Sequence, residues 1–375
     1  MSKTYTYIAT ATMGLESIVA KEIQALGYDT EVENGKVMFE GPIEAMIEAN
    51  LWLRTSDRVK LVIGKFHTDT FDDLFEQTKA LPWEEFIPVY GEFPVDGRSV
   101  KSTLFSISDC QRIVKKAIVE RLKQTYNQDW FQEEGPQFKI EVALLKDEAT
   151  LTIDTSGEGL HKRGYRYLHS MAPLKETLAA ALIKLTNWRY DQVLVDPFCG
   201  SGTIPIEASL MAKNIAPGLY RNFASEQWSW VPEQAWSEAR AKAKEKINDR
   251  DVHIYGFDKD PEMVKLSENN AELAHVPEIR FSRSAVDQLP AIDGRGVLVM
   301  NPPYGTRLED EKAVQKIYSQ LGTRVRQAYD DWSVYVLTAN EQFESLYGAD
   351  ATKKRKLYNG NIKTDYYQYW AKRKR

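Results

Sequence analysis

The sequence predicts an α/β protein in which a doubly wound sheet follows two smaller α/β blocks. From about residue 157 onward, short apolar runs alternate with helical patterns, which is typical of a parallel sheet covered by helices. Before it, residues 1–66 follow the strand–helix–hairpin–helix–strand order of a ferredoxin-like plait. At roughly 100–200 residues per domain, the 375 residues are enough for two or three domains.

Hydrophobic periodicity gives the elements of the first block. Asn34-Gly35 is a tight-turn dipeptide between two β-rich segments, which predicts a hairpin there. Apolar residues recur at helical spacing from Leu15 to Leu26, and Gly27 follows as a stop signal. The predicted elements are a strand at 5–9, a helix at 15–26, a hairpin over 30–39, a helix over 43–53 and a strand over 59–66.

The second block, residues 67–156, is locally basic. Residues 98–123 hold seven positive and two negative side chains, a net of +5. A solvated helix face is the plain interpretation, but flanking serines that can donate to phosphate oxygens also favour nucleic-acid binding. The predicted elements are helices over 71–81 and 108–126, a β-like stretch over 99–105, and strands over 138–145 and 149–154.

Composition excludes several classes of protein. The net charge of −5, from 49 Lys+Arg against 54 Asp+Glu, argues against a chain coated in basic residues. Two cysteines, Cys110 and Cys199, build no disulfide framework, and five histidines without metal spacing predict no metal site. No apolar run approaches the ~18 residues of a membrane span, and the N-terminus has no signal-peptide pattern. We therefore expect a soluble, cytoplasmic protein without a membrane partner.

The last block, residues 157–375, alternates strands with helices. The predicted strands are at 192–195, 253–257, 279–281, 297–300 and 333–337. The predicted helices are at 203–212, 261–274 and 312–328, and a hairpin turning at 359–361 closes the chain. The final 25 residues, 351–375, carry nine basic residues and one acidic residue.

Residues 196–203, Asp-Pro-Phe-Cys-Gly-Ser-Gly-Thr, stand directly between a predicted strand and a predicted helix. Glycines there let the backbone approach a ligand and leave helix N-terminal amides facing it. Two features argue against a dinucleotide site. Pro205 replaces the third glycine, and the next strand-end acid, Asp258, lies 62 residues after Asp196 instead of about 20. Asp258 suits the paired hydroxyls of a ribose; the alternative is a helix N-cap before Pro261.

The second motif is residues 301–305, Asn-Pro-Pro-Tyr-Gly, immediately after a predicted buried strand. Two prolines hold a rigid turn at the strand's carboxyl end, where open α/β sheets bind ligands. Such a turn can direct the side-chain oxygen of Asn301 and the carbonyl of Pro302 at one amino group, while Tyr304 stacks on a flat ring. Two acceptors stabilise the positive charge that develops on a methylated amine. Alone, the pentapeptide is also compatible with an ordinary turn.

Together these motifs give the chain a family resemblance. It resembles the class I S-adenosylmethionine-dependent methyltransferases of the amino-group type, whose motif is Asn/Asp-Pro-Pro-Tyr/Phe. More closely, it is similar to the THUMP-domain RNA methyltransferases of the large-subunit rRNA guanine-N2 type along essentially the whole chain. Further matching stretches are residues 14–16, 99–123, 161–166 and 172–176. The resemblance implies an N-terminal ferredoxin-like domain (1–66), a THUMP RNA-binding domain (67–156) and a Rossmann-like methyltransferase domain (157–375).

The resemblance also implies roles for single residues. Asp196 and the glycine loop would face the methionine moiety of S-adenosyl-L-methionine, Asp258 the ribose and Asp287 the adenine amine; without the resemblance, Asp287 is only a surface acid. The implied cofactor-binding residues are Arg163, Tyr165, Pro173, Asp196, Phe198, Gly200, Ser201, Gly202, Thr203, Asp258, Asp287 and Asn301. The implied catalytic residues, which would hold the target base, are Asn301, Pro302, Pro303 and Tyr304. The residues expected to bind RNA are Arg98, Lys101, Arg112, Lys115 and Lys116.

The resulting hypothesis is methyl transfer from S-adenosyl-L-methionine to an exocyclic amine of an RNA base, with guanine N2 in 23S rRNA as the first candidate. The partner would then be 23S rRNA or a ribosomal precursor. Adenine N6 methylation of RNA or DNA, tRNA guanine-N2 methylation, protein glutamine-N5 methylation and a non-catalytic ribosome-assembly factor stay open as alternatives. Pyrimidine-C5 methylation needs a cysteine beside the base, and neither cysteine fits. The sequence leaves the modified nucleotide and the oligomeric state open.

Overall fold

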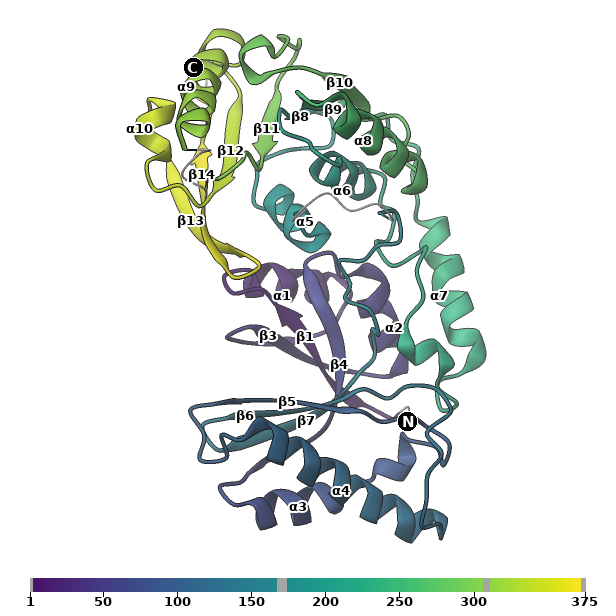
Figure 1. Cartoon of the computed structure of the whole chain (residues 1–375). Helices are drawn as coiled ribbons and strands as arrows, with labels where there is room; N and C mark the ends of the chain where they lie inside the picture. Colours follow the sequence, from purple (N-terminus) through teal and green to yellow (C-terminus); the bar gives the residue numbers. More distant parts are fainter. Residues whose placement is uncertain (1–2, 167–173, 306–310, 372–375) are drawn as a thin grey trace. The chain divides into compact units, whose positions relative to one another are not determined.

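The computed structural model describes residues 3–166, 174–305 and 311–371 (Figure 1). The chain divides into two compact units. Unit 1 comprises Met1–Ala11, Val19–Leu160 and Arg221–Lys242, and unit 2 comprises Thr12–Ile18, His161–Tyr220 and Ala243–Arg375. The units do not follow chain order, because residues 221–242 belong to unit 1 and residues 12–18 belong to unit 2.

Unit 1 contains a sheet in the order β2-β3-β1-β4-β7-β6-β5. Helix α4 packs against β5 and β6, and α3 packs against α4. The strands are β1 Tyr5–Ala11, β2 Thr30–Glu33, β3 Lys36–Gly41, β4 Ser56–His67, β5 Val95–Val100, β6 Ile140–Leu145 and β7 Glu148–Asp154. The helices are α1 Glu16–Ala25, α2 Ile43–Trp52, α3 Phe71–Lys79, the short η1 Trp83–Glu85 and α4 Ile107–Tyr126.

Strand β4 joins the two predicted N-terminal blocks into one sheet. It is 12 residues long, pairs with β1 along its first half and pairs with β7 from Lys60 to His67. Its pairing with β7 shifts register between Val62 and Gly64. A Cβ at Gly64 would lie 2.7 Å from a methyl group of Leu81, so a larger residue here would require the Leu81 side chain to shift. The first two blocks therefore share a continuous backbone ladder.

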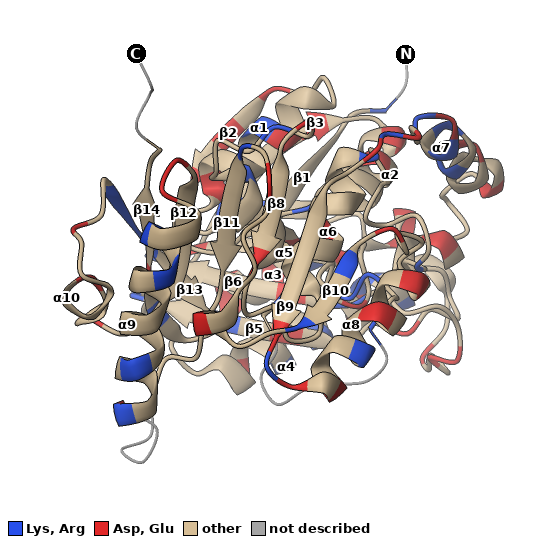
Figure 2. Ribbon diagram, turned by 90° about the horizontal axis from the view of Figure 1, so that it is seen from above, with Lys and Arg blue, Asp and Glu red and all other residues tan. Residues whose placement is uncertain are grey.

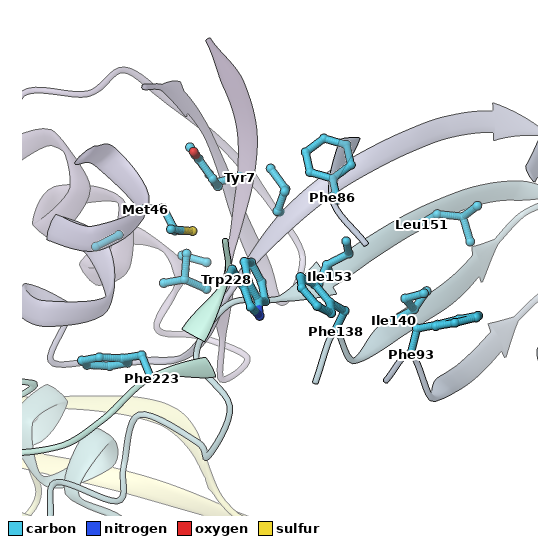
Figure 3. Close-up of a cluster of buried hydrophobic side chains, with 14 of the residues drawn as sticks. Tyr7, Met46, Phe86, Phe93, Phe138, Ile140, Leu151, Ile153, Phe223 and Trp228 are labelled. Atoms are coloured by element: carbon cyan, nitrogen blue, oxygen red, sulfur yellow. The ribbon is translucent and has the colours of Figure 1, made fainter. Parts of the chain in front are cut away.

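The inserted segment of unit 1, Arg221–Lys242, supplies aromatic side chains to the core (Figure 3). Trp228 is buried and stacks on Phe138 with ring centroids 5.0 Å apart, and its indole nitrogen donates to the Gln137 carbonyl at 3.1 Å. Trp236 stacks on Phe223 at 4.8 Å. The segment contains η2 Ala224–Gln227 and most of α7 Glu233–Glu245. Its indole rings therefore stabilise unit 1, which contains the predicted RNA-binding block.

Unit 2 contains a sheet in the order β10-β9-β8-β11-β12-β14-β13. Strands β10, β9, β8, β11 and β12 run parallel, and the C-terminal hairpin adds antiparallel strands beside β12. The strands are β8 Val193–Asp196, β9 Ile254–Asp258, β10 Arg280–Arg283, β11 Gly296–Met300, β12 Ser333–Thr338, β13 Lys353–Asn359 and β14 Ile362–Tyr369. The helices are α5 Glu176–Lys184, α6 Thr203–Ala212, α8 Pro261–Leu273, the short η3 Val286–Gln288, α9 Glu311–Ala328 and α10 Phe343–Tyr347.

These sheets confirm the predicted α/β class with a doubly wound sheet, but the bounds of β5 differ from the prediction, and helices α5, α7 and α10 were not predicted. The β-like stretch expected over 99–105 is wrong in its bounds, because the strand is β5. Asp96 and Gly97 are poor strand formers, but parallel pairing with β6 overrides local propensity there. Helix α5 was not predicted; all but its last residue are buried, so it has no polar face to reveal a helical period. In the described residues, no helix combines the length and apolar character needed to cross a membrane.

Candidate functional site

Three polar residues meet at one edge of the unit 2 sheet. Asp196 and Asp258 end β8 and β9, and Asn301 directly follows β11. Strand β8 lies between β9 and β11, and the chain winds to opposite sides of β8 in its two halves. The carboxyl ends of β8 and β11 therefore flank the topological switch point, where open α/β sheets bind ligands.

The loop between β8 and α6 depends on two glycines in the left-handed region, Gly200 with φ +51° and Gly202 with φ +83°. A Cβ at Gly202 would lie 2.9 Å from the Cβ of Ser267, so this glycine lets the loop pack against α8. A Cβ at Gly200 would meet no atom within 4 Å. Gly200 therefore leaves open space beside the loop. The backbone N–H of Gly202 closes the turn by donating a hydrogen bond to the Cys199 carbonyl at 2.8 Å.

Two carboxylates flank this loop. Asp196 is 1% exposed and accepts from the Phe198 amide at 3.0 Å, and Asp258 accepts from the Gly200 amide at 3.0 Å. Burial, together with the charge of Asp258, raises the pKa of Asp196 to about 8. The N-cap of α8 is Asp260, which accepts from the Glu262 amide at 2.9 Å. Asp258 is therefore not the helix cap that the sequence had left open as an alternative.

Arg163 and Tyr165 lie beneath the loop. Both are buried, and both contact Glu207 of α6: the Arg163 Nε atom at 3.3 Å and the Tyr165 hydroxyl at 3.3 Å. These contacts hold α6 against the segment that precedes β8. Pro173, predicted for the same pocket, lies outside the described residues.

Arg166 contacts the glycine loop more directly, although the sequence did not single it out. Its guanidinium donates to the Thr203 hydroxyl at 3.0 Å and pairs with Glu176 at 3.1 Å. Burial raises the pKa of Glu176 to about 7, against the opposing effect of Arg166. Thr203 and Ser201 are 5% exposed, and their hydroxyls lie 3.4 Å apart. This cluster fixes the first turn of α6.

Two other predicted cofactor residues lie at the rim of this arrangement. Phe198 is half-buried and packs against the apolar core of unit 2. Asp287 lies on η3, is exposed, and accepts from the Gln320 side chain of α9 at 2.8 Å. Its carboxylate therefore already has a hydrogen-bond donor from the chain.

The tetrapeptide after β11 is held by its own tyrosine and by α9. The Tyr304 hydroxyl donates to the Asn301 side-chain oxygen at 2.6 Å. The Tyr318 hydroxyl donates to the Pro303 carbonyl at 2.7 Å and also contacts Thr338 at 2.8 Å. Pro302 is buried and Pro303 is exposed. Burial raises the pKa of Tyr304 to about 12, so the phenol keeps its hydrogen at neutral pH.

Asn359, which the sequence did not single out, contacts the tetrapeptide, and two exposed lysines lie on α9. Asn359, at the end of β13, donates from its amide nitrogen to the Tyr304 hydroxyl at 3.2 Å. Helix α9 shows blue segments in Figure 2, and its exposed Lys312 and Lys316 lie within its first turns. From the sequence, Asn359 is indicated only as part of a turn. Lysines at helical spacing are common on solvent-exposed helix faces, so their pattern did not indicate a site.

The predicted RNA-binding residues of unit 1 differ in their surroundings. Arg98, Lys101, Arg112 and Lys116 are exposed. Arg98 lies 3.4 Å from Glu141, and Arg112 pairs with Asp109. Lys115 is only partly exposed; its ammonium lies 2.7 Å from Glu133 and donates to the Phe93 carbonyl at 3.0 Å. Four of the five side chains therefore present charge to solvent, while Lys115 is held within unit 1.

A cavity of about 680 Å³ lies elsewhere in unit 2. Its walls include the first residues of β11, β12 and β13, so it opens at the amino ends of the parallel strands. It is lined among others by Asn187, Arg295, Ser333, Lys353 and Trp370. It is therefore at the opposite edge of the sheet from Asp196 and Asn301. Among the described residues, no group of three His, Cys, Asp or Glu side chains has an arrangement suited to a metal ion.

Comparison with known families gives three matches along the chain. The RMKL-like methyltransferase domain (UPF0020) matches residues 163–368, the RlmL ferredoxin-like domain matches residues 6–60, and the THUMP domain matches residues 68–154. These matches confirm the resemblance that the two motifs predict. They also confirm the ferredoxin-like, THUMP and Rossmann-like composition of the fold. The exact domain boundaries stay a prediction.

Individual relatives agree with these matches. The chain is 55% identical to "Putative RNA methyltransferase YpsC" of Bacillus subtilis (strain 168), covering 99% of this chain and 97% of that protein. It is 34% identical to the ribosomal RNA large subunit methyltransferase K/L of Syntrophotalea carbinolica, covering 95% of this chain but only 52% of that protein. The chain thus spans about half the length of this K/L relative.

A solved structure extends the likeness to three dimensions. The structure described as "Crystal structure of SMU.472, a putative methyltransferase complexed with SAH" superimposes with a TM-score of 0.94 at 44% sequence identity, covering 100% of both chains. Sequence, family models and fold agree over nearly the full length. The chain therefore belongs to the RMKL-like methyltransferase family, with RlmL ferredoxin-like and THUMP domains ahead of its methyltransferase domain.

Proposed function

We propose that this chain transfers a methyl group from S-adenosyl-L-methionine to an exocyclic amine of an RNA base, with guanine N2 in 23S rRNA as the first candidate. The observation that carries the proposal is the placement of Asn301 and the Asp196 loop at the ends of adjacent strands, β11 and β8. Neighbouring strands lie about 4.8 Å apart, so a base and a cofactor can meet there. The K/L relative is named for rRNA methylation, and this chain contains a THUMP domain.

The residues around the glycine loop fit this cofactor. S-adenosyl-L-methionine carries a sulfonium and an ammonium group, and both are cationic. Asp196 is buried, and among the described residues the charge that acts on the pKa of its carboxyl is that of Asp258, which raises it. A cationic ligand would relieve this repulsion, and the open space beside Gly200 would admit it. SMU.472, with 44% identity, was crystallised with SAH, the demethylated form of the cofactor.

The cofactor supplies the methyl group together with its own leaving group, so the chain's part is positioning and charge stabilisation. Asn301 Oδ1 and the Pro302 carbonyl accept the hydrogens of the target amine, which favours a pyramidal nitrogen. The Tyr304 ring stacks on the base, which leaves its helix at a cost of a few kcal/mol. No strong general base is required.

Unit 1 binds the RNA through its basic side chains. Arg98, Lys101, Arg112 and Lys116 contact phosphates, which position a nucleic acid without reading its sequence. Such binding weakens as salt rises, because each neutralised phosphate releases counterions. A net charge of −5 for the whole chain does not oppose this local attraction.

The proposal is tested by incubating the purified chain with labelled cofactor and unmodified rRNA, tRNA or DNA, and by analysing the digested nucleosides by mass spectrometry. We expect N2-methylguanosine from rRNA. N6-methyladenosine would instead assign the same tetrapeptide to adenine. Absence of both, together with no cofactor binding at millimolar concentration, would favour a non-catalytic RNA-binding factor.

The matched variant is Asn301→Ala. It should lower kcat by about 100-fold or more, the usual effect of removing one transition-state hydrogen-bonding group. Cofactor affinity, measured by calorimetry with SAH, should change by less than about twofold. Full activity in this variant would contradict the amine-acceptor role of Asn301.

A further inference from the structure

The C-terminal hairpin places one polar side chain beside the tetrapeptide. Strands β13 and β14 pair in antiparallel register, with Asn359 opposite Ile362 across a two-residue turn. The turn begins at Gly360, whose φ of +61° suits glycine. Strand β14 pairs in turn with β12 of the central sheet. The position of Asn359 is therefore fixed by sheet register.

Asn359, Tyr304 and Asn301 form a hydrogen-bonded chain. The Asn359 amide nitrogen donates to the Tyr304 hydroxyl oxygen at 3.2 Å, across 55 residues of sequence. The Tyr304 hydroxyl donates to Asn301 Oδ1 at 2.6 Å. A phenol has a single hydrogen. Because Asn359 occupies the hydroxyl as an acceptor, that hydrogen is directed to Asn301.

The direction of these hydrogen bonds decides whether Asn301 presents its side-chain oxygen or its side-chain nitrogen to a ligand. An amide oxygen has two lone pairs, so Oδ1 can accept from Tyr304 and from a second donor at the same time. If the amide flipped, its NH₂ group would face the hydroxyl hydrogen, and two donors would oppose each other. The bond from Tyr304 therefore keeps the oxygen, and not the nitrogen, available to a ligand's amine.

We propose that Asn359 is a positioning residue for methyl transfer: by donating to Tyr304 it directs the hydroxyl to Asn301 and so keeps Oδ1 facing the target amine. This inference rests on the proposed function above and gives the C-terminal hairpin a part in the reaction. Asn359 acts through Tyr304 and makes no contact of its own with the reacting atoms. Hydrogen bonds in such a chain also polarise one another, which strengthens the acceptor arrangement.

The informative variant is Asn359→Asp. A carboxylate only accepts, so the Tyr304 hydroxyl would turn toward it and leave Asn301 free to flip. We expect kcat to fall about tenfold, which corresponds to about 1.4 kcal/mol, with the KM for the cofactor unchanged. The ratio of variant to wild-type kcat should rise as pH falls toward about 4, near the ordinary pKa of an aspartate, because a protonated carboxyl donates again. Asn359→Ala leaves the hydroxyl free to donate to Asn301 and should lose less than Asn359→Asp.

A double-mutant cycle with Tyr304→Phe separates positioning from a general effect on the fold. The ring is kept and the hydroxyl is lost, so Asn359→Asp should cause no further fall in kcat in this background beyond about twofold. Asn361→Asp is the control: it adds the same charge to the same turn, two residues from Asn359. It should leave kcat within about twofold of wild type and reveal any shared effect of charge on the KM for RNA.

The outcomes separate the two proposals. If the wild-type chain methylates no RNA amine, the proposed function fails and this inference falls with it. If the wild type is active but Asn359→Asp behaves like Asn361→Asp, the inference alone is wrong. The same holds if Asn359→Asp and Tyr304→Phe lower kcat additively. Unchanged affinity for SAH in each variant verifies that unit 2 is folded.

Discussion

Two buried aspartates, one in each unit, end neighbouring strands in the sequence but have different surroundings. Asp154 ends β7 and is 5% exposed, and Asp196 ends β8 and is 1% exposed. Asp154 pairs with Arg58 and accepts from the Ser156 amide at 2.9 Å, and both Arg58 and Lys60 oppose the rise in its pKa that burial causes. For Asp196, the charge in the described part of the chain that acts on the pKa is that of Asp258, and it raises the pKa further.

Under the proposed function, the difference separates a structural carboxylate from one that would bind the cofactor. Asp154 forms an ion pair that links β7 to β4 within unit 1. Asp196 directly precedes the glycine loop, and burial and the charge of Asp258 both disfavour its ionised form. Buried ionisable groups with strongly shifted pKa values cluster at binding sites, where a ligand can supply a partner of opposite charge.

The largest expected effect is on cofactor binding. Asp196→Asn should weaken binding of S-adenosyl-L-methionine by about 100-fold, because a charge-assisted contact to a cationic ligand is lost. Asp154→Asn is the matched variant in unit 1 and should leave that affinity unchanged. Calorimetric titration with SAH measures both. Equal affinities for the two variants would break the distinction between the two aspartates.

The second effect is on stability in unit 1. Asp154→Asn leaves Arg58 without its carboxylate, and the Arg58 side chain is 33% exposed, so solvent compensates part of the loss. We expect the free energy of unfolding to fall by about 1–2 kcal/mol. Urea unfolding followed by circular dichroism tests this. An unchanged midpoint would show that the pair contributes nothing measurable.

The third effect concerns pH. Because the pKa of Asp196 is raised from 3.8 to about 8, the folded chain holds a proton there that the unfolded chain has released between these values. The contribution of Asp196 to stability therefore falls as pH rises from about 4 to 8. Asp196→Asn removes this loss and should be more stable than the wild type at pH 8, by at least about 1 kcal/mol.

That gain should shrink as pH falls toward 4, because the unfolded chain progressively takes up the proton that the folded chain already holds. It should also shrink when SAH saturates the wild type, because the ligand stabilises only the native site. Thermal unfolding at pH 5 and pH 8, with and without SAH, measures these differences. A difference between variant and wild type that does not change with pH would contradict the assignment.

The smallest effect applies the same distinction to cations. Lys116 is exposed, whereas the adjacent Lys115 contacts Glu133. Lys116→Ala should weaken RNA binding a few-fold and lower the salt slope by about 1. Lys115→Ala should instead act mainly on the stability of unit 1. Filter binding of RNA at several salt concentrations compares the two variants. Equal losses of RNA affinity would instead place Lys115 and Lys116 on one RNA-binding surface.

Local patterns predicted much of the fold and the centre of the site. Helix α6 has the bounds that its apolar run and preceding glycine predicted, Thr203–Ala212. Asp196, Asp258 and Asn301 meet because the carboxyl ends of parallel strands share an edge, and this follows from sequence once the strands are identified. Strand β5 was misplaced, since its strand character comes from pairing with β6 and not from its own residues.

Contacts between residues far apart in the chain, which depend on how strands pair, could not be predicted from the sequence. Asn359 contacts Tyr304 because an antiparallel hairpin is added beside β12, and nothing local to residue 359 indicates that pairing. Trp228 lies in the core of unit 1 although it follows the glycine loop in sequence. Arg166 lies in the family-matching stretch 161–166, but its contact with Thr203 follows only from where α6 packs.

The return of Arg221–Lys242 to unit 1 has a consequence for synthesis on the ribosome. Domains generally form as the chain emerges, at about 5–20 residues per second. The N-terminal 160 residues leave the ribosome without Trp228 and Trp236, so their core is missing two indole rings until some 80 further residues have been added. During those seconds the chain exposes the surface that these rings will cover. A nascent-chain series should show protease resistance of the N-terminal part rising once Lys242 has emerged.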